Sequence, residues 1–91
     1  SRNAKKIEVF KMQKDISLTI IDYATALYYH PDNERVKELL KAETTKVKLY
    51  FDNAVLKAIV AFIDCMNNNE SQEQKDALYE NLSTQLRKSI K

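Results

Sequence analysis

The sequence predicts an all-α protein, an antiparallel up-and-down bundle of three long helices in a single domain over residues 1–91. The chain has no glycine and one proline, so the permissive backbone positions that hairpin turns need are missing. Apolar side chains recur at three- and four-residue steps, as in amphipathic helices. Ala54–Met66 is apolar except at Lys57 and Asp64, which predicts a central helix covered on more than one side. This stretch is shorter than the ~20 apolar residues that a membrane span needs.

The first helix is expected from about Ala4 to Tyr29. Its apolar face is formed by Val9, Met12, Ile16, Ile20, Tyr23 and Leu27. The pair His30-Pro31 ends it, because a residue that precedes proline is disfavoured in the helical region. Asp32 or Asn33 then supplies the N-cap of the next helix.

The second helix is expected from Asn33 to Met66, a length of ~50 Å, because no strong breaker occurs in between. Thr44-Thr45 and Asp52-Asn53 are weaker helix formers. A break in the region Thr44–Asn53 would divide this helix in two and give a bundle of four helices.

The third helix follows a polar connector, Asn67–Asn69. Ser71 and Gln74 stand at the spacing of a capping box, which predicts a helix start near Gln72. Leu78, Leu82, Leu86 and Ile90 form its apolar stripe.

The expected lengths locate a candidate contact surface. The third helix covers only the C-terminal half of a long second helix, so Leu18–Tyr29 and Val36–Val47 would form a two-helix finger. Exposed apolar patches usually mark contact sites, and tyrosine is enriched at interfaces. The candidate partner-binding residues, from the finger and from the basic C-terminal end, are Leu18, Tyr23, Leu27, Tyr28, Tyr29, Leu39, Leu40, Arg87, Lys88 and Lys91. A four-helix bundle would instead bury the apolar surface of the finger internally, and the sequence leaves both arrangements open.

No catalytic chemistry is indicated. The single histidine, His30, stands at a turn without a paired nucleophile, and the single cysteine, Cys65, reads as a small buried hydrophobe. Without glycine the phosphate-cradling motifs are absent. We therefore expect no enzyme, no catalytic residue, no metal site and no cofactor.

A nucleic-acid-binding regulator is a weaker alternative. The net charge is only +2 and the sequence pI is about 8.6, short of the value above ~9 typical of nucleic-acid-binding domains. No recognition-helix signature is present. The lysines of this chain are those expected on the surface of any helical bundle.

Two parts of the chain carry a resemblance to a known family. The first part is Asn3–Ile7 followed by Asp15–Leu18. The second is the succession of an apolar helix, a polar connector and an amphipathic helix at Leu56–Ile63, Asn67–Gln72 and Leu78–Leu86. Together they resemble the bacteriocin immunity proteins of lactic acid bacteria, in particular the enterocin A type. The resemblance implies a cytoplasmic, antiparallel four-helix bundle. It also implies a protein that protects the producer at the membrane receptor of the bacteriocin, through the C-terminal part of the chain.

A fainter likeness is to type III secretion needle subunits. It rests on Pro31–Asn33, Leu49-Tyr50 and Asn53-Ala54, but those subunits finish near the position of Ile63 and have no third helix. A self-assembling or secretion-apparatus subunit is therefore the alternative function.

The expected function is that of a non-enzymatic protein–protein interaction module, most specifically a bacteriocin self-immunity protein. The expected partner is another protein, such as a membrane receptor complex, or a second copy of the chain in a homodimer. The sequence has no transmembrane segment and begins without an apolar signal region, which favours a cytoplasmic location.

Overall fold

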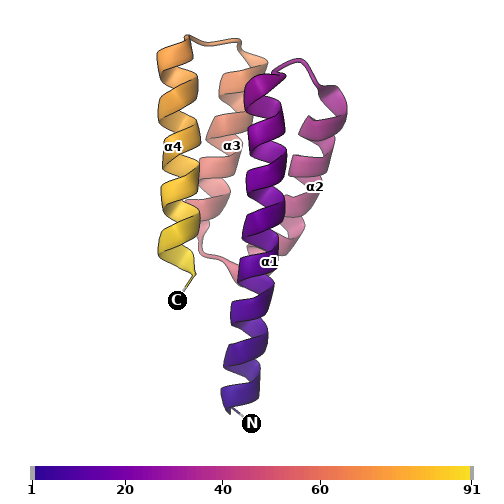
Figure 1. The fold of residues 1–91 in the computed structure, drawn as a ribbon, viewed down its shortest axis with the longest axis vertical. Helices are drawn as coiled ribbons and strands as arrows, with labels where there is room; N and C mark the ends of the chain where they lie inside the picture. Colours follow the sequence, from indigo (N-terminus) through magenta and orange to yellow (C-terminus); the bar gives the residue numbers. More distant parts are fainter. Residues whose placement is uncertain (1, 91) are drawn as a thin grey trace.

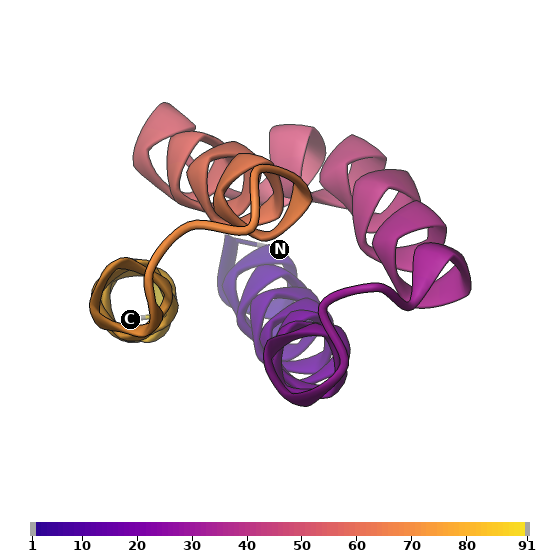
Figure 2. The ribbon, with the colours of Figure 1, turned by 90° about the horizontal axis from the view of Figure 1, so that it is seen from above.

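The computed structural model describes residues 2–90, with side chains from Ala4 to Ile90, and these residues form helices and no strand. The helices are α1 (Arg2–Tyr29), α2 (Glu34–Tyr50), α3 (Asn53–Asn67) and α4 (Gln72–Ser89). Figure 1 shows the chain turning back at each connection between helices. Seen from above, the helices follow one another around a common core, so that α1 and α3 each lie beside α2 and α4 (Figure 2). The predicted all-α class is confirmed.

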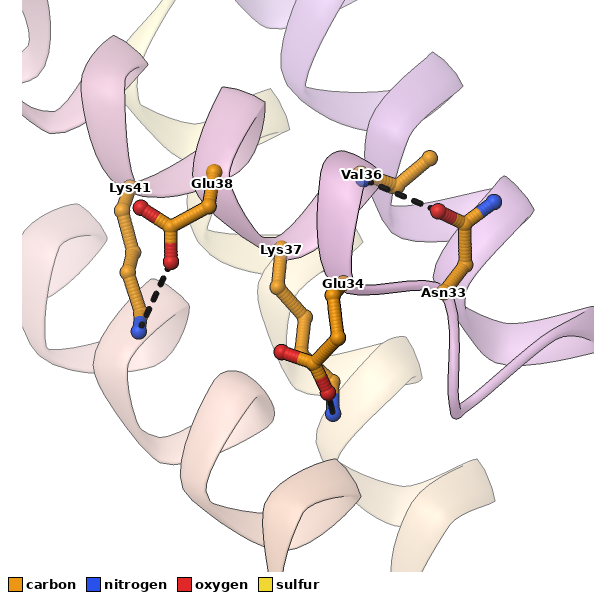
Figure 3. Close-up of polar contacts among 6 residues, drawn as sticks. All are labelled: Asn33, Glu34, Val36, Lys37, Glu38 and Lys41. Atoms are coloured by element: carbon orange, nitrogen blue, oxygen red, sulfur yellow. Dashed lines mark hydrogen bonds and ion pairs between the residues drawn. The ribbon is translucent and has the colours of Figure 1, made fainter.

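The connection between α1 and α2 is built as the sequence predicts. α1 ends at Tyr29, two residues before Pro31, and the Asn33 side chain then accepts a hydrogen bond from the Val36 N–H at 3.1 Å (Figure 3). This bond satisfies one of the free N–H groups of the first turn of α2. The N-cap is therefore Asn33, one of the two predicted candidates.

Lys37 is a buried cation in the first turns of α2. Only 6% of the residue is exposed, and its amine reaches Glu34 at 3.1 Å (Figure 3). Because Glu34 itself is exposed, the lysine buries its aliphatic stem and keeps its charge paired at the surface.

The expected continuous helix from Asn33 to Met66 is wrong, and the four-helix alternative holds. Phe51 and Asp52 both adopt extended backbone angles, with φ/ψ of −130°/161° and −81°/174°, so α2 stops and α3 starts anew. The Gln13 side-chain amide donates to the Tyr50 carbonyl oxygen at 2.8 Å. A side chain of α1 thus satisfies a carbonyl that the break leaves without a helical partner.

The connection between α3 and α4 depends on a left-handed residue. Asn69 has φ of 47°, its N–H donates to the Met66 carbonyl at 3.2 Å, and the Glu70 N–H donates to the Cys65 carbonyl at 3.2 Å. These two bonds define a Schellman motif, in which asparagine takes the position usually held by glycine. Ser71 then caps α4 by accepting from the Gln74 N–H at 3.2 Å, as its spacing predicts.

The core draws on every helix, and α3 contributes most. Its fully or almost fully buried side chains are Val55, Ala58, Ile59, Phe62, Ile63, Cys65 and Met66. They pack against buried residues of the other three helices, among them Ile20, Leu27, Leu40, Val47, Leu82 and Leu86. The stretch that is apolar on almost all sides therefore occupies the interior, as predicted.

α1 is longer than its neighbours. α1 has 28 residues and α2 has 17, so about 11 residues of α1, or ~16 Å of helix, extend beyond the length over which the two helices can pair. Figure 1 shows this N-terminal part of α1 standing past the ends of the other helices. We call residues 4–13 the overhang.

Candidate functional site

The predicted finger is closed, because α4 packs against α1 once the middle helix is divided. Leu27 and Leu40 were expected to contact a partner, but both are 0% exposed and belong to the core. Tyr23, Tyr28 and Leu39 are half-buried. Leu27 and Leu40 are therefore packing residues, and their assignment as contact residues is corrected.

The remaining predicted contact residues are spread over the surface. Leu18 and Tyr29 are 58% and 73% exposed, at separate places on α1. Arg87 is exposed and lies 3.9 Å from Glu80. Lys88 is also exposed, near the end of α4, and Lys91 lies outside the described residues. The structure does not bring these groups together into one site.

A polar aromatic cluster closes the end of the bundle that carries Tyr28. The Tyr28 ring lies 5.2 Å from the Tyr29 ring and 5.1 Å from the Tyr79 ring. Its hydroxyl donates to the Asp76 carboxylate, and the Gln72 amide donates to both groups at 2.9 and 2.8 Å. The hydrogen bond raises the pKa of Tyr28 and, together with the one from Gln72, lowers the pKa of Asp76. These hydrogen bonds and ring contacts stabilise the packing of α1 against α4.

We expect the Tyr28 hydroxyl to stabilise the fold only within a window of pH. The pKa of Asp76 is lowered on folding, so its contribution is present above the ordinary value of 3.8 and is lost as the pH falls through the folded value. The pKa of Tyr28 is raised, so its contribution is present below 10.0 and is lost as the pH rises through the folded value. The difference in unfolding free energy between wild type and Tyr28→Phe should therefore be greatest between these two values.

Urea titrations across this range measure that difference. Tyr29→Phe is the matched control, because the Tyr29 side chain is 73% exposed and takes part in none of these hydrogen bonds. If the difference in unfolding free energy between wild type and Tyr28→Phe stays constant in acid and in alkali, the hydrogen bond from Tyr28 to Asp76 does not stabilise the fold as proposed.

The opposite end of the bundle carries a hollow of about 870 Å³. It exists because the overhang continues past the corner between α2 and α3 and past the end of α4. We call it the end hollow. It is lined by Lys5, Lys6, Val9, Phe10, Gln13, Tyr50, Phe51, Asp52, Gln85, Lys88 and Ser89.

The lining of the end hollow combines apolar side chains with lysines. Val9 and Phe10 are 42% and 41% exposed, and Tyr50 and Phe51 are half-buried beside them. The hydrogen bond from Gln13 to the Tyr50 carbonyl holds the overhang against the corner. Apolar side chains left exposed together in a concavity are typical of a binding site.

The charges around the end hollow are mostly positive. Lys5, Lys6 and Lys88 contribute three cations, and Asp52 is the one acidic side chain in the lining. Within residues 4–90, none of these three lysines is within ion-pair distance of a carboxylate. Their charges are therefore free to face a ligand.

A second hollow, of about 270 Å³, lies between α2 and α3. Its lining includes Leu56 and Val60, with Lys41, Lys48 and Asp64 around them. It is the smaller of the two and draws on two helices only, so the end hollow is the stronger candidate.

The sequence named the tyrosine end as the candidate contact surface and left open that a four-helix bundle would bury it. In the structure α4 covers that end, and the end hollow lies at the other. A continuous second helix leaves the tyrosine end uncovered, whereas a helix that stops at Tyr50 leaves the start of α1 uncovered. Val9, Phe10 and Phe51 were therefore missed as site residues. The available signal was the mismatch between the long first helix and the short segment from Asn33 to Asp52.

Cysteine chemistry and metal binding can be examined at the described residues. Cys65 is buried, as predicted, and burial raises the pKa of its thiol. No group of three or more potential metal ligands lies together in residues 2–90. In the same range, no helix has both the length and the apolar character to span a bilayer.

No protein-family model, curated protein or solved structure significantly matches this chain.

Proposed function

We propose that this chain is a non-enzymatic helical module that works by binding another protein, and that its specific role is bacteriocin self-immunity. The end hollow, which the C-terminal end of α4 also lines through Gln85, Lys88 and Ser89, carries this proposal. It exposes Val9 and Phe10 beside Tyr50 and Phe51, an aromatic concavity with a polar rim. Protein interfaces are typically built this way, with aromatic anchors at the centre and polar groups around them.

The immunity role is supported by the resemblance to the enterocin A type. Ala4–Ile7, within the first resembling part, lies in the overhang, and Leu56–Ile63 and Leu78–Leu86 lie in α3 and α4. The chain reversals between successive helices are those that an up-and-down bundle requires. The partner would then be the membrane receptor complex of the bacteriocin, reached from the cytoplasmic side. Four-helix folds serve many functions, so the end hollow and not the fold carries the proposal.

Expression in a bacteriocin-sensitive lactic acid bacterium tests this function. We expect the wild-type chain to raise survival in the presence of an enterocin A-type bacteriocin, and Phe10→Glu to abolish the protection. Leu18→Glu is the matched control, because Leu18 is an exposed apolar residue on the same helix outside the end hollow. It should protect like wild type.

Circular dichroism on the purified proteins shows whether each variant is folded. A folded wild-type chain that gives no protection would overturn the immunity role. Loss of protection in Leu18→Glu but not in Phe10→Glu would place the contact surface elsewhere.

A further inference from the structure

We propose that the end hollow takes an amphipathic α-helix of a partner protein, with acidic side chains flanking the apolar stripe of that helix. This inference rests on the proposed function as a protein-binding module and adds the chemistry of the partner. It follows from the shape of the hollow, the apolar side chains of its lining, and its three lysines, which form no ion pair within residues 4–90.

The shape favours a helix. About three turns of α1 stand free where α2 and α4 have already ended, so one side of α1 lacks the neighbour that the rest of the helix has. A further helix beside the overhang would extend the bundle at the usual axis separation of about 8–10 Å. Its apolar residues would meet Val9, Phe10 and Phe51, which line the hollow from α1 and from the corner after α2. Docking of an amphipathic helix into an apolar groove is a common mode of peptide recognition.

The charges favour an acidic helix. Lys5 and Lys6 line the hollow from α1 and Lys88 lines it from α4, and Asp52 is the one acidic side chain of the lining. A helix docked in the hollow would present flanking carboxylates to ammonium groups of both helices. Complementary charges of this kind select the partner and speed its association.

The same charges argue against a second copy of the chain. In a two-fold dimer the same patch meets itself, so the interface would hold the three lysines of each copy against one aspartate of each. Such an excess of like charge costs binding free energy. A membrane surface fits less well than a helix, because the hollow is concave and its aromatic residues Tyr50 and Phe51 are half-buried.

Titration with designed peptides tests the inference on the intact chain. The probe is a synthetic amphipathic helix of about 18 residues, long enough to be helical, with leucine and phenylalanine on one face and flanking glutamates. The control peptide carries lysine at every glutamate position. By calorimetry we expect the acidic peptide to bind at least about tenfold more tightly than the basic one.

Reversing the charge of lysines in the end hollow should shift the preference of the protein from the acidic peptide to the basic one. We expect the double variant Lys5→Glu/Lys6→Glu to lose at least about tenfold in affinity for the acidic peptide and to gain affinity for the basic one. Lys57→Glu, at an exposed lysine of α3 outside the hollow, should bind both peptides like wild type. Both variants change exposed side chains, and circular dichroism shows that they fold.

Several results would overturn the inference. One is equal affinity for the two peptides, and another is an unchanged affinity in Lys5→Glu/Lys6→Glu. Phosphatidylglycerol vesicles binding through these lysines while neither peptide binds would identify a membrane surface as the ligand. A dimer in sedimentation equilibrium that Phe10→Glu dissociates would identify a second copy.

Failure of this inference is distinguishable from failure of the proposed function. If Phe10→Glu abolishes protection but the peptides bind equally, the end hollow still serves immunity and the acidic helix is excluded. If the acidic peptide is preferred but the wild-type chain gives no protection, the partner class stands and the immunity role fails.

Discussion

Replacing Leu27 with alanine is expected to lower the free energy of unfolding by about 2–5 kcal/mol. The side chain is 0% exposed in the core between helices, so truncation removes buried apolar contacts and leaves a cavity. Domains of this kind are stable by about 5–15 kcal/mol, so the variant should lose a large part of its stability. Urea denaturation followed by circular dichroism measures the change.

Leu18→Ala is the matched control for this experiment. It makes the same substitution on the same helix, at a side chain that is 58% exposed, and should change stability by no more than about 0.5 kcal/mol. The sequence placed both leucines on one contact surface, whereas the structure separates them into core and surface. Equal effects of the two substitutions would contradict the closed bundle.

Asn69→Ala is expected to destabilise the protein by about 2 kcal/mol, the sum of two effects. Asn69 has φ of 47°, a left-handed conformation that costs a residue with a Cβ about 1 kcal/mol or more, and asparagine tolerates it better than alanine. Its side-chain oxygen also accepts from the Lys75 amine at 3.1 Å, and Lys75 is only 9% exposed. The substitution therefore strains the turn and removes the partner of a buried cation.

Two further substitutions separate these effects. Asn69→Gly keeps the left-handed backbone and removes only the acceptor, so it should cost less than Asn69→Ala. Asn68→Ala, at an exposed neighbour with right-handed backbone, should be close to neutral. If Asn68→Ala and Asn69→Ala prove equally destabilising, the special role of Asn69 is refuted.

Local sequence signals predicted most helix ends. His30-Pro31, Asn33 and Ser71 act by contacts within a few residues, and each ends or caps a helix as expected. These signals can be read from sequence because the stabilising partner is the adjacent backbone.

The break in the middle helix could not be predicted in the same way, because two weak points compete and tertiary contacts decide between them. Thr44 remains helical, with its hydroxyl bonded to the Lys41 carbonyl at 2.6 Å, as threonine often does inside a helix. The break falls at Phe51 and Asp52, where Gln13 takes the Tyr50 carbonyl and the aromatic rings pack against the core. The hydrogen bond from Gln13 and the packing of the rings both involve residues distant in sequence from the break.

The position of the candidate site follows from that one break. Once α2 ends at Tyr50, the tyrosine end closes and the overhang opens. Val9 thereby changes from a member of the predicted apolar face to an exposed residue, and Leu40 changes from a contact candidate to a core residue. The choice between a continuous and a divided middle helix thus decides which end of the bundle carries the open apolar surface.

The division of the middle helix and the resulting contact between α1 and α4 are the central claim, and nuclear Overhauser effects test it most directly. The Tyr28 and Tyr79 rings lie 5.1 Å apart, and the Thr25 and Tyr79 hydroxyl oxygens are 2.7 Å apart. We predict Overhauser contacts of Tyr79 with Tyr28 and Thr25 in the full chain. With a continuous middle helix, α4 would lie along its C-terminal half, far from Thr25. Contacts between α1 and α2 without any between Tyr79 and α1 would contradict the account.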